Sequence, residues 1–284
     1  MASNPLSASY RELKIQAKTD LPGREVETLL TSMVRSAWQF LKRHCQTETL
    51  TSSVPGKHYF GFRQAEPSRA INADLFVSTE DEFAGLLGAF HRGFVGLGAT
   101  EIARAVYTMA FSVFAAHDVT RIGRKASATF FEVLVGHLVA KALQISPRKN
   151  VVIPESGGRL STDFVFDPGP RSRKLHLPIK TSTRERAVQA WVHQLVLNRI
   201  FGDDNYRGIL VVAAETKRNS RTGSVVEICV PKQLQMFQSR LSRMERLYYL
   251  DPPEKYLALC NTHPRIDVKS FATFFSEAKS LMAH

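Results

Sequence analysis

The sequence predicts a mixed α/β core, with helices packed on a central sheet, preceded by a mainly helical N-terminal region. In residues 118–284, one long apolar helix pattern is followed by alternating strand and helix patterns. In residues 1–117, apolar side chains recur mainly at helical spacing. We therefore expect two parts that meet near residue 118.

The N-terminal part is predicted to contain three helices. They cover residues 23–44, 81–94 and 99–117, and the second follows a cap-like "STEDE". Between the first two helices, residues 51–78 are interrupted by proline and glycine. We expect this segment to be a loop with a short strand pair.

The C-terminal part is predicted to begin with a helix over residues 126–143. Apolar and β-branched runs then predict strands over residues 150–156, 161–167, 175–182, 208–216 and 224–230. Further helices are expected over residues 187–201 and 235–250. The second and third strands flank a turn rich in proline and glycine, which is typical of a hairpin.

The composition is that of an ordinary globular protein, but the charge is unevenly distributed. The 284 residues carry a net charge of +12. Residues 1–117 have 12 Lys and Arg against 11 Asp and Glu, whereas residues 118–284 have 26 against 15. This excess indicates a polyanion partner such as a nucleic acid, although basic proteins also bind acidic proteins or use charge for solubility.

Other features of the chain narrow the class of protein. No apolar run approaches the roughly 18 residues of a membrane span, so we expect a cytoplasmic protein without a membrane partner. Cys45, Cys229 and Cys260 are far apart and lack metal-ligand spacing. This argues against a zinc site and against a disulfide framework.

Three residues of the predicted core have the chemistry to act together. Asp163 lies in one strand of the expected hairpin, Lys180 ends the other, and Glu132 lies in the preceding helix. Two carboxylates and a lysine suit metal-assisted cleavage of a phosphodiester. Alternatively, Asp163 and Lys180 are ordinary hairpin residues. Glu132 is flanked by apolar side chains and is therefore expected to be partly desolvated, which requires it to be paired, protonated or metal-bound.

The segment "KTSTRER", after a strand, a turn and a strand carrying an Asp, resembles the type II restriction endonucleases of the PD-(D/E)XK superfamily. The resemblance is to the group that recognises CCGG, CCNGG or CCWGG sites. The upstream "ASATFFE" is similar to that group's helix motif. The resemblance covers residues 123–215 and implies a restriction-endonuclease-like mixed central sheet flanked by helices.

The resemblance implies roles for individual residues. Asp163 would bind the metal, Lys180 would be the catalytic lysine, and Glu132 would be a further acid at the metal site. The main-chain carbonyl of Ile179 would be another metal ligand, and the cofactor would be Mg²⁺.

Arg184, Glu185 and Arg186 would then read bases. An arginine pairs with O6 and N7 of guanine, and a carboxylate accepts from the N4 amino group of cytosine. The alternative is a solvated, salt-bridged start of a helix.

The sequence departs from the family pattern near the lysine. Pro178 occupies the position of an expected acid, and His193 and Gln194 stand where the group has a carboxylate on the following helix. His193 is a possible phosphate contact, with a packing or surface histidine as the alternative. Lys217 and Arg218, expected in a hairpin loop, are either possible phosphate contacts or part of an ordinary basic turn.

The expected function is a Mg²⁺-dependent endonuclease of double-stranded DNA that reads a G·C-rich, CCGG- or CCNGG-like palindrome and leaves 5′-phosphate ends. Cutting both strands predicts a homodimer or a higher oligomer. Residues 1–117 would contact DNA or mediate dimerisation, and residues 118–284 would form the nuclease core. Two alternatives remain: a related nuclease without strict sequence specificity, and a basic DNA-binding protein without catalysis.

Overall fold

The computed structural model describes residues 5–121, 123–154, 156–170, 172–184 and 187–283. Its contacts divide the chain into two compact units. The N-terminal unit comprises Met1–Leu138 and Thr216–Ile228, and the sheet unit comprises Val139–Glu215 and Cys229–His284. The functional division between residues 1–117 and 118–284 stays a prediction.

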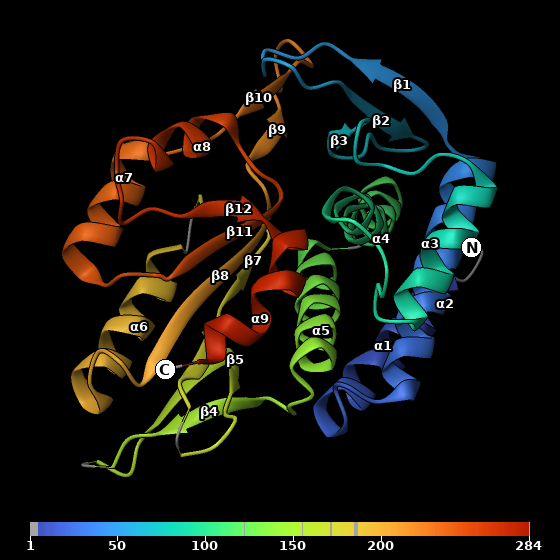
Figure 1. The fold of residues 1–284 in the computed structure, drawn as a ribbon. Coiled ribbons are helices and arrows are strands. Elements are labelled where there is room, and N and C mark those ends of the chain that lie inside the picture. The colour runs from blue at the N-terminus through green and yellow to red at the C-terminus, as the bar shows by residue number, and fades with distance from the viewer. Residues whose placement is uncertain (1–4, 122, 155, 171, 185–186, 284) are drawn as a thin grey trace. The chain divides into compact units, whose positions relative to one another are not determined.

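The N-terminal unit is built mainly from helices, as predicted. These are α1 (Pro5–Thr19), α2 (Arg24–His44), α3 (Glu80–His91), α4 (Ala99–Val119) and the greater part of α5 (Arg124–Leu143) (Figure 1). The three helices predicted from the pattern are confirmed as α2, α3 and α4. The predicted cap is also present, because the hydroxyl of Thr79 accepts the N–H of Glu82 at the start of α3.

Aromatic residues fill the core of this unit. Trp38 of α2 stacks on Phe83 of α3 with ring centroids 4.3 Å apart, and its indole N–H donates to the Val77 carbonyl at 3.0 Å. Tyr107 stacks on Phe111 within α4 at 4.0 Å. Helix α4 is buried along nearly its whole length, which explains its apolar residues on every side.

Two small β-structures complete the N-terminal unit. An antiparallel sheet consists of β1 (Gln46–Leu50), β2 (Tyr59–Arg63) and β3 (Ile71–Asn72). The pair β2–β3 confirms the strand pair expected within residues 51–78, and β1 was not predicted. A separate hairpin joins β9 (Thr216–Arg218) to β10 (Val225–Glu227).

The strand expected over residues 224–230 therefore forms in this hairpin and not in the central sheet. Val225 donates its N–H to the Thr51 carbonyl at 2.8 Å and accepts from the N–H of Ser53 at 3.0 Å. Its side chain is buried in a cluster with Leu50 and Tyr59. These contacts hold β10 against a segment that precedes it by more than 170 residues.

The sheet unit contains the predicted mixed sheet. Its strands are β4 (Arg148–Val152), β5 (Arg159–Phe166), β6 (Lys174–Leu177), β7 (Ile179–Lys180), β8 (Tyr206–Ala214), β11 (Arg246–Asp251) and β12 (Val268–Ser270). The strand order is β12-β11-β8-β6-β5-β4, and β7 also pairs with β8. β4, β5 and β6 pair antiparallel, while the pairs that involve β7, β8, β11 and β12 are parallel.

Helices cover both faces of this sheet, as the sequence predicts. One face packs against α6 (Ala187–Phe201), α7 (Pro231–Met236) and α8 (Glu254–Cys260), and the other against α9 (Phe274–Met282) (Figure 1). In β11, Tyr249 points into the first core, while Tyr248 contacts Phe274 of α9. Successive side chains of β11 therefore pack into the hydrophobic cores on opposite faces of the sheet.

The helix predicted over residues 235–250 is wrong in its second half. After α7, a π-helical turn (Phe237–Leu241) ends the helical segment, and β11 begins at Arg246. Residues 247–250 are buried where β11 pairs with β8 and β12. Burial on both faces of the sheet is therefore the better explanation of this apolar run than helical periodicity.

Helix α5 is apolar along much of its length. Within the described part of the chain, Lys125–Leu143 has the length and composition of a membrane-spanning helix. However, 61% of that window is buried inside the protein. A buried core helix meets the same criteria, so this is weak evidence for membrane crossing.

Candidate active site

The β5–β6 hairpin brings Asp163 and Lys180 together. Phe164 pairs with Leu177, so Asp163 lies beside the end of β6. Pro178 follows, and because it has no N–H, it interrupts the edge that β6 presents to β5. The chain continues as β7, whose partner is β8 and not β5.

A single carboxylate oxygen organises this end of the hairpin. The N–H of Ile179 donates to Oδ2 of Asp163 at 2.7 Å, and Nζ of Lys180 donates to the same oxygen at 3.0 Å. The lysine Nζ also donates to the Ile179 carbonyl at 3.1 Å. The side chains of Asp163 and Lys180 are 26% and 22% exposed, so solvent and a ligand can reach them. The predicted proximity of these two residues is confirmed.

The oxygens at this point are suited to a hard cation. Oδ1 of Asp163 has no hydrogen-bond partner among the residues that the structure describes. The Ile179 carbonyl accepts from Lys180 and has a second lone pair. Within the described ranges, no three His, Cys, Asp or Glu side chains gather as a preformed metal cage. Mg²⁺ commonly binds through one or two carboxylates and completes its shell with water and phosphate oxygens.

Glu132 lies on the part of α5 that belongs to the N-terminal unit. Its side chain is half-buried, and both neighbours, Phe131 and Val133, are buried. The side chain is therefore partly buried, as expected from its apolar neighbours in the sequence. The approach of Glu132 to Asp163 stays a prediction.

His193 of α6 lies within electrostatic reach of the hairpin residues. Burial lowers the pKa of its imidazole; the Asp163 carboxylate raises this pKa, and the Lys180 ammonium lowers it. The imidazole is half-buried, and Gln189 contacts it at 3.5 Å. The structure thus places His193 close enough to Asp163 and Lys180 for their charges to affect its pKa.

Gln194 has a different role, because it points into the core. Its Nε2 donates to Oδ1 of Asn198 at 2.7 Å and to the Tyr206 carbonyl at 2.8 Å. Its Oε1 therefore accepts from Nδ1 of His176 at 2.9 Å. This bond joins α6 to β6, the strand that precedes Pro178 and Lys180.

His176 is a site-supporting residue that the sequence reasoning missed. It is fully buried in β6, and burial lowers its pKa to about 4, with the Gln194 hydrogen bond acting in the opposite direction. A neutral imidazole that donates from Nδ1 leaves Nε2 as an acceptor. The signal in the sequence is a histidine between two leucines in an otherwise apolar strand, which requires a buried polar partner.

The predicted base readers are described only in part. Arg184 is exposed and follows Thr183, which is buried. Glu185 and Arg186 lie outside the described residues. The helix predicted after them is confirmed as α6, which begins at Ala187.

Lys217 and Arg218 lie on strand β9, not in the loop where they were expected. Arg218 pairs with Val225 of β10 in the strand register, and its guanidinium forms an ion pair with Glu48 at 2.6 Å. Lys217 is exposed. Of the two, the structure leaves Lys217 more available for a phosphate.

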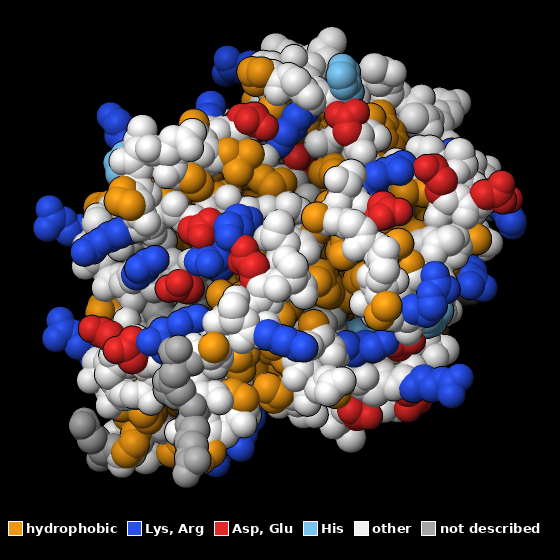
Figure 2. All heavy atoms as spheres, in the orientation of Figure 1, with side chains coloured by type: hydrophobic (Ala, Val, Ile, Leu, Met, Phe, Trp, Pro, Cys, Tyr) orange, Lys and Arg blue, Asp and Glu red, His pale blue; other side chains and the backbone are white. Residues whose placement is uncertain are grey.

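Arginine and lysine side chains are spread over the face drawn in Figure 2, with acidic residues among them.

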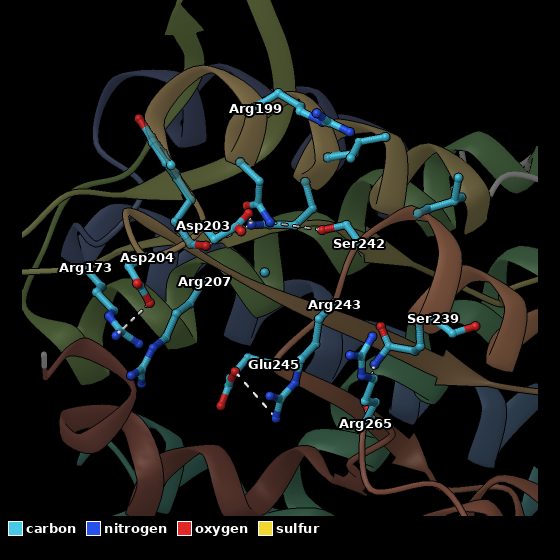
Figure 3. A pocket seen from close by; sticks show the side chains of 18 residues that line it. Arg173, Arg199, Asp203, Asp204, Arg207, Ser239, Ser242, Arg243, Glu245 and Arg265 are labelled. Atoms are coloured by element: carbon cyan, nitrogen blue, oxygen red, sulfur yellow. Dashed lines mark hydrogen bonds and ion pairs between the residues drawn. The ribbon is translucent and has the colours of Figure 1, made fainter.

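A charged concavity lies in the sheet unit, with a volume of about 840 Å³. Arg173, just before β6, and Arg207, at the start of β8, line it (Figure 3). Lys180 lies near the opposite end of β8, paired with Val212. Arg173 forms an ion pair with Asp204 at 3.0 Å. The concavity is therefore distinct from the Asp163 site.

Comparisons with known proteins identify the fold by its similarity to solved structures. No family model and no curated protein matches the sequence. The crystal structure of the type IIP restriction endonuclease Kpn2I is similar, with a TM-score of 0.85 over 98% of this chain and 97% of that chain, at 22% identity. A complex of the restriction endonuclease PspGI with substrate DNA matches at a TM-score of 0.46 and 14% identity, over 72% of this chain and 93% of that chain. The chain thus has the restriction-endonuclease fold of Kpn2I, with its mixed central sheet flanked by helices.

Proposed function

We propose that this protein is a sequence-specific, Mg²⁺-dependent endonuclease of double-stranded DNA. The observation that carries the proposal is the hydrogen-bonded group of Asp163, Ile179 and Lys180 at the end of the β5–β6 hairpin. The restriction-endonuclease fold supports the proposal, as does the excess of positive charge.

The chain supplies oxygen ligands for the metal. Asp163 would hold Mg²⁺ through Oδ1, the Ile179 carbonyl would be a second ligand, and Glu132 would be a further acid. When bound, the ion supplies a Lewis acid that polarises the phosphate and stabilises the charge developing on it.

Lys180 would orient the attacking water. An ammonium group has three N–H donors. Two of them are directed to Oδ2 of Asp163 and to the Ile179 carbonyl, which leaves one for a water molecule. His193 would donate a hydrogen bond to a phosphate oxygen, at the helical position where the resemblance implies a carboxylate.

Sequence choice would come from Arg184, Glu185 and Arg186. Two arginines and an acid can read adjacent G·C pairs in the major groove, as in a CCGG- or CCNGG-like palindrome. Two copies of the chain, related by a two-fold axis, would place one site on each strand. The products would carry 5′-phosphates.

The test is a plasmid digest with Mg²⁺ and with a chelator, comparing the wild type with Asp163→Asn and Lys180→Gln. We expect discrete fragments only with Mg²⁺, and at least about a 100-fold loss of cleavage in each variant. The matched controls are Asp167→Asn and Lys174→Gln, because these residues form a similar ion pair, at 3.1 Å, near the turn of the same hairpin. The controls should cleave normally.

Other results would contradict the proposal in distinct ways. Normal cleavage by Asp163→Asn, or by the wild type in the presence of the chelator, would refute the proposed metal site. A smear in place of discrete fragments would indicate a nuclease without strict specificity. DNA binding without cleavage would indicate a non-catalytic binding protein. Sequencing the fragment ends identifies the cognate site.

A further inference from the structure

A buried carboxylate binds Thr183, the residue immediately before the predicted base readers in the sequence. Glu215 follows β8, at the end of the central strand, and is only 1% exposed. Its Oε1 accepts the backbone N–H of Thr183 at 2.7 Å and the hydroxyl of Thr183 at 2.5 Å. The hydroxyl of Tyr249 donates to the same oxygen at 3.4 Å. All three residues belong to the sheet unit.

A second buried tyrosine extends this network. The Thr183 hydroxyl uses its proton for Glu215, so at 3.4 Å it accepts from the hydroxyl of Tyr256. Tyr256 in turn accepts the N–H of Val230 at 2.9 Å. Burial raises the pKa of Tyr256 to about 12, and burial followed by the charge of Glu215 raises that of Tyr249 well above its usual value. Both phenols therefore remain protonated donors at neutral pH.

The network fixes the position of the residue that immediately precedes the predicted base readers. Thr183 immediately precedes Arg184, and α6 begins at Ala187. The backbone and the side chain of Thr183 both bind one carboxylate, so its position and its orientation relative to β8 are set together. Moving Thr183 away would remove two donors from a buried charge, which is costlier than losing a bond between neutral groups.

We propose that Glu215 is a positioning residue for sequence readout, which holds Thr183 so that the following residues meet the base edges in one geometry. The proposal rests on the proposed function. It assigns an effect on base discrimination to a residue that binds Thr183 and is shielded from solvent. Displaced readers would still attract phosphates, so the loss should fall on discrimination and not on general DNA affinity.

The experiment compares Glu215→Gln and Thr183→Val with the wild type in gel-shift titrations with Ca²⁺ in place of Mg²⁺. The probes are the cognate duplex, identified from the wild-type digest, a duplex with one changed base pair, and a scrambled duplex. We expect the cognate-to-changed affinity ratio to fall by about tenfold in each variant. Affinity for the scrambled duplex should stay within about twofold of the wild type.

Tyr248→Phe is the matched control for lost stability. Its hydroxyl donates to Glu277 at 2.7 Å on the opposite face of the sheet, so the change also removes a buried hydrogen bond to a carboxylate. We expect a lower melting temperature and an unchanged affinity ratio. Tyr249→Phe, which removes the weaker donor to Glu215, should reduce the ratio in a folded protein even if Glu215→Gln fails to fold.

The outcomes separate this inference from the proposed function. If the wild type discriminates between duplexes and the folded variants keep its ratio, the positioning role is refuted and the proposed function stands. If Tyr248→Phe lowers the ratio as much as Thr183→Val, the effect is general destabilisation, and the positioning role is again refuted. A wild-type protein without any sequence preference refutes both.

Discussion

Replacing His176 by Asn should make the protein less sensitive to acid. The imidazole is fully buried and donates from Nδ1 to Gln194, and burial lowers its pKa to about 4. An asparagine amide can donate in nearly the same place but does not gain a proton at acidic pH. The change therefore separates the titration of His176 from its hydrogen bond.

The expected magnitude follows from the shift in the pKa. A histidine in an unfolded chain has a pKa of about 6.5, so below that pH the unfolded state binds a proton that the folded state excludes. Stability from neutral His176 is thus fully present above pH 6.5 and is lost as the pH falls toward the folded value of about 4. Between pH 8 and pH 5 the loss is about 2 kcal/mol.

The assay is urea unfolding of the wild type and His176→Asn at pH 8, 7, 6 and 5, followed by circular dichroism. We expect the variant to lose about 2 kcal/mol less than the wild type between pH 8 and pH 5. His117, whose pKa burial also lowers to about 4, is present in both proteins and cancels in the difference.

Equal pH dependence in the wild type and His176→Asn would refute the assignment of a neutral, buried His176.

Three further perturbations test the site and its support. Gly208→Ala should destabilise the fold by about 1–3 kcal/mol in urea unfolding, because a Cβ there would lie 2.6 Å from Oε1 of Gln194; unchanged stability would contradict this packing. His193→Ala should slow cleavage on the order of 10–100-fold with little change in DNA binding, and full activity would exclude a phosphate contact. Arg184→Ala should cost about 1–3 kcal/mol of discrimination at one G·C position in gel-shift titrations. Lys217→Ala should instead weaken binding to every sequence and lower the salt slope by about one; a change confined to the cognate duplex would contradict that role.

Much of the candidate site could be predicted because its signals are local. The turn rich in proline and glycine between two short apolar runs predicts the β5–β6 hairpin, and a hairpin brings residues near its two outer ends together. The hairpin therefore predicts that Asp163 and Lys180 lie side by side, and the structure confirms this. The sequence did not reveal that one oxygen of Asp163 accepts from both Ile179 and Lys180, because that depends on the break at Pro178 and on the pairing of β7 with β8.

Where the prediction failed, contacts distant in the sequence decided the structure. Residues 246–251 have a spacing compatible with a helix, but pairing with β8 and β12 makes them a central strand. Residues 225–227 have the composition of a core strand, but the buried cluster around Leu50 holds them in the N-terminal unit. A short apolar run is compatible with a helix or with a strand, and with more than one sheet. Its tertiary contacts decide which of these forms.

The sequence by itself determined the alternation of helices and strands in the core, the hairpin, and the acid and lysine that the hairpin carries, since periodicity and turn chemistry act over a few residues. Only the tertiary structure decided which polar groups are buried together. His176 meets Gln194 across 18 residues, and Thr183 meets Glu215 across 32. A buried polar group must find its partner wherever the fold provides one, and that partner is set by strand order and helix packing, which local sequence does not specify.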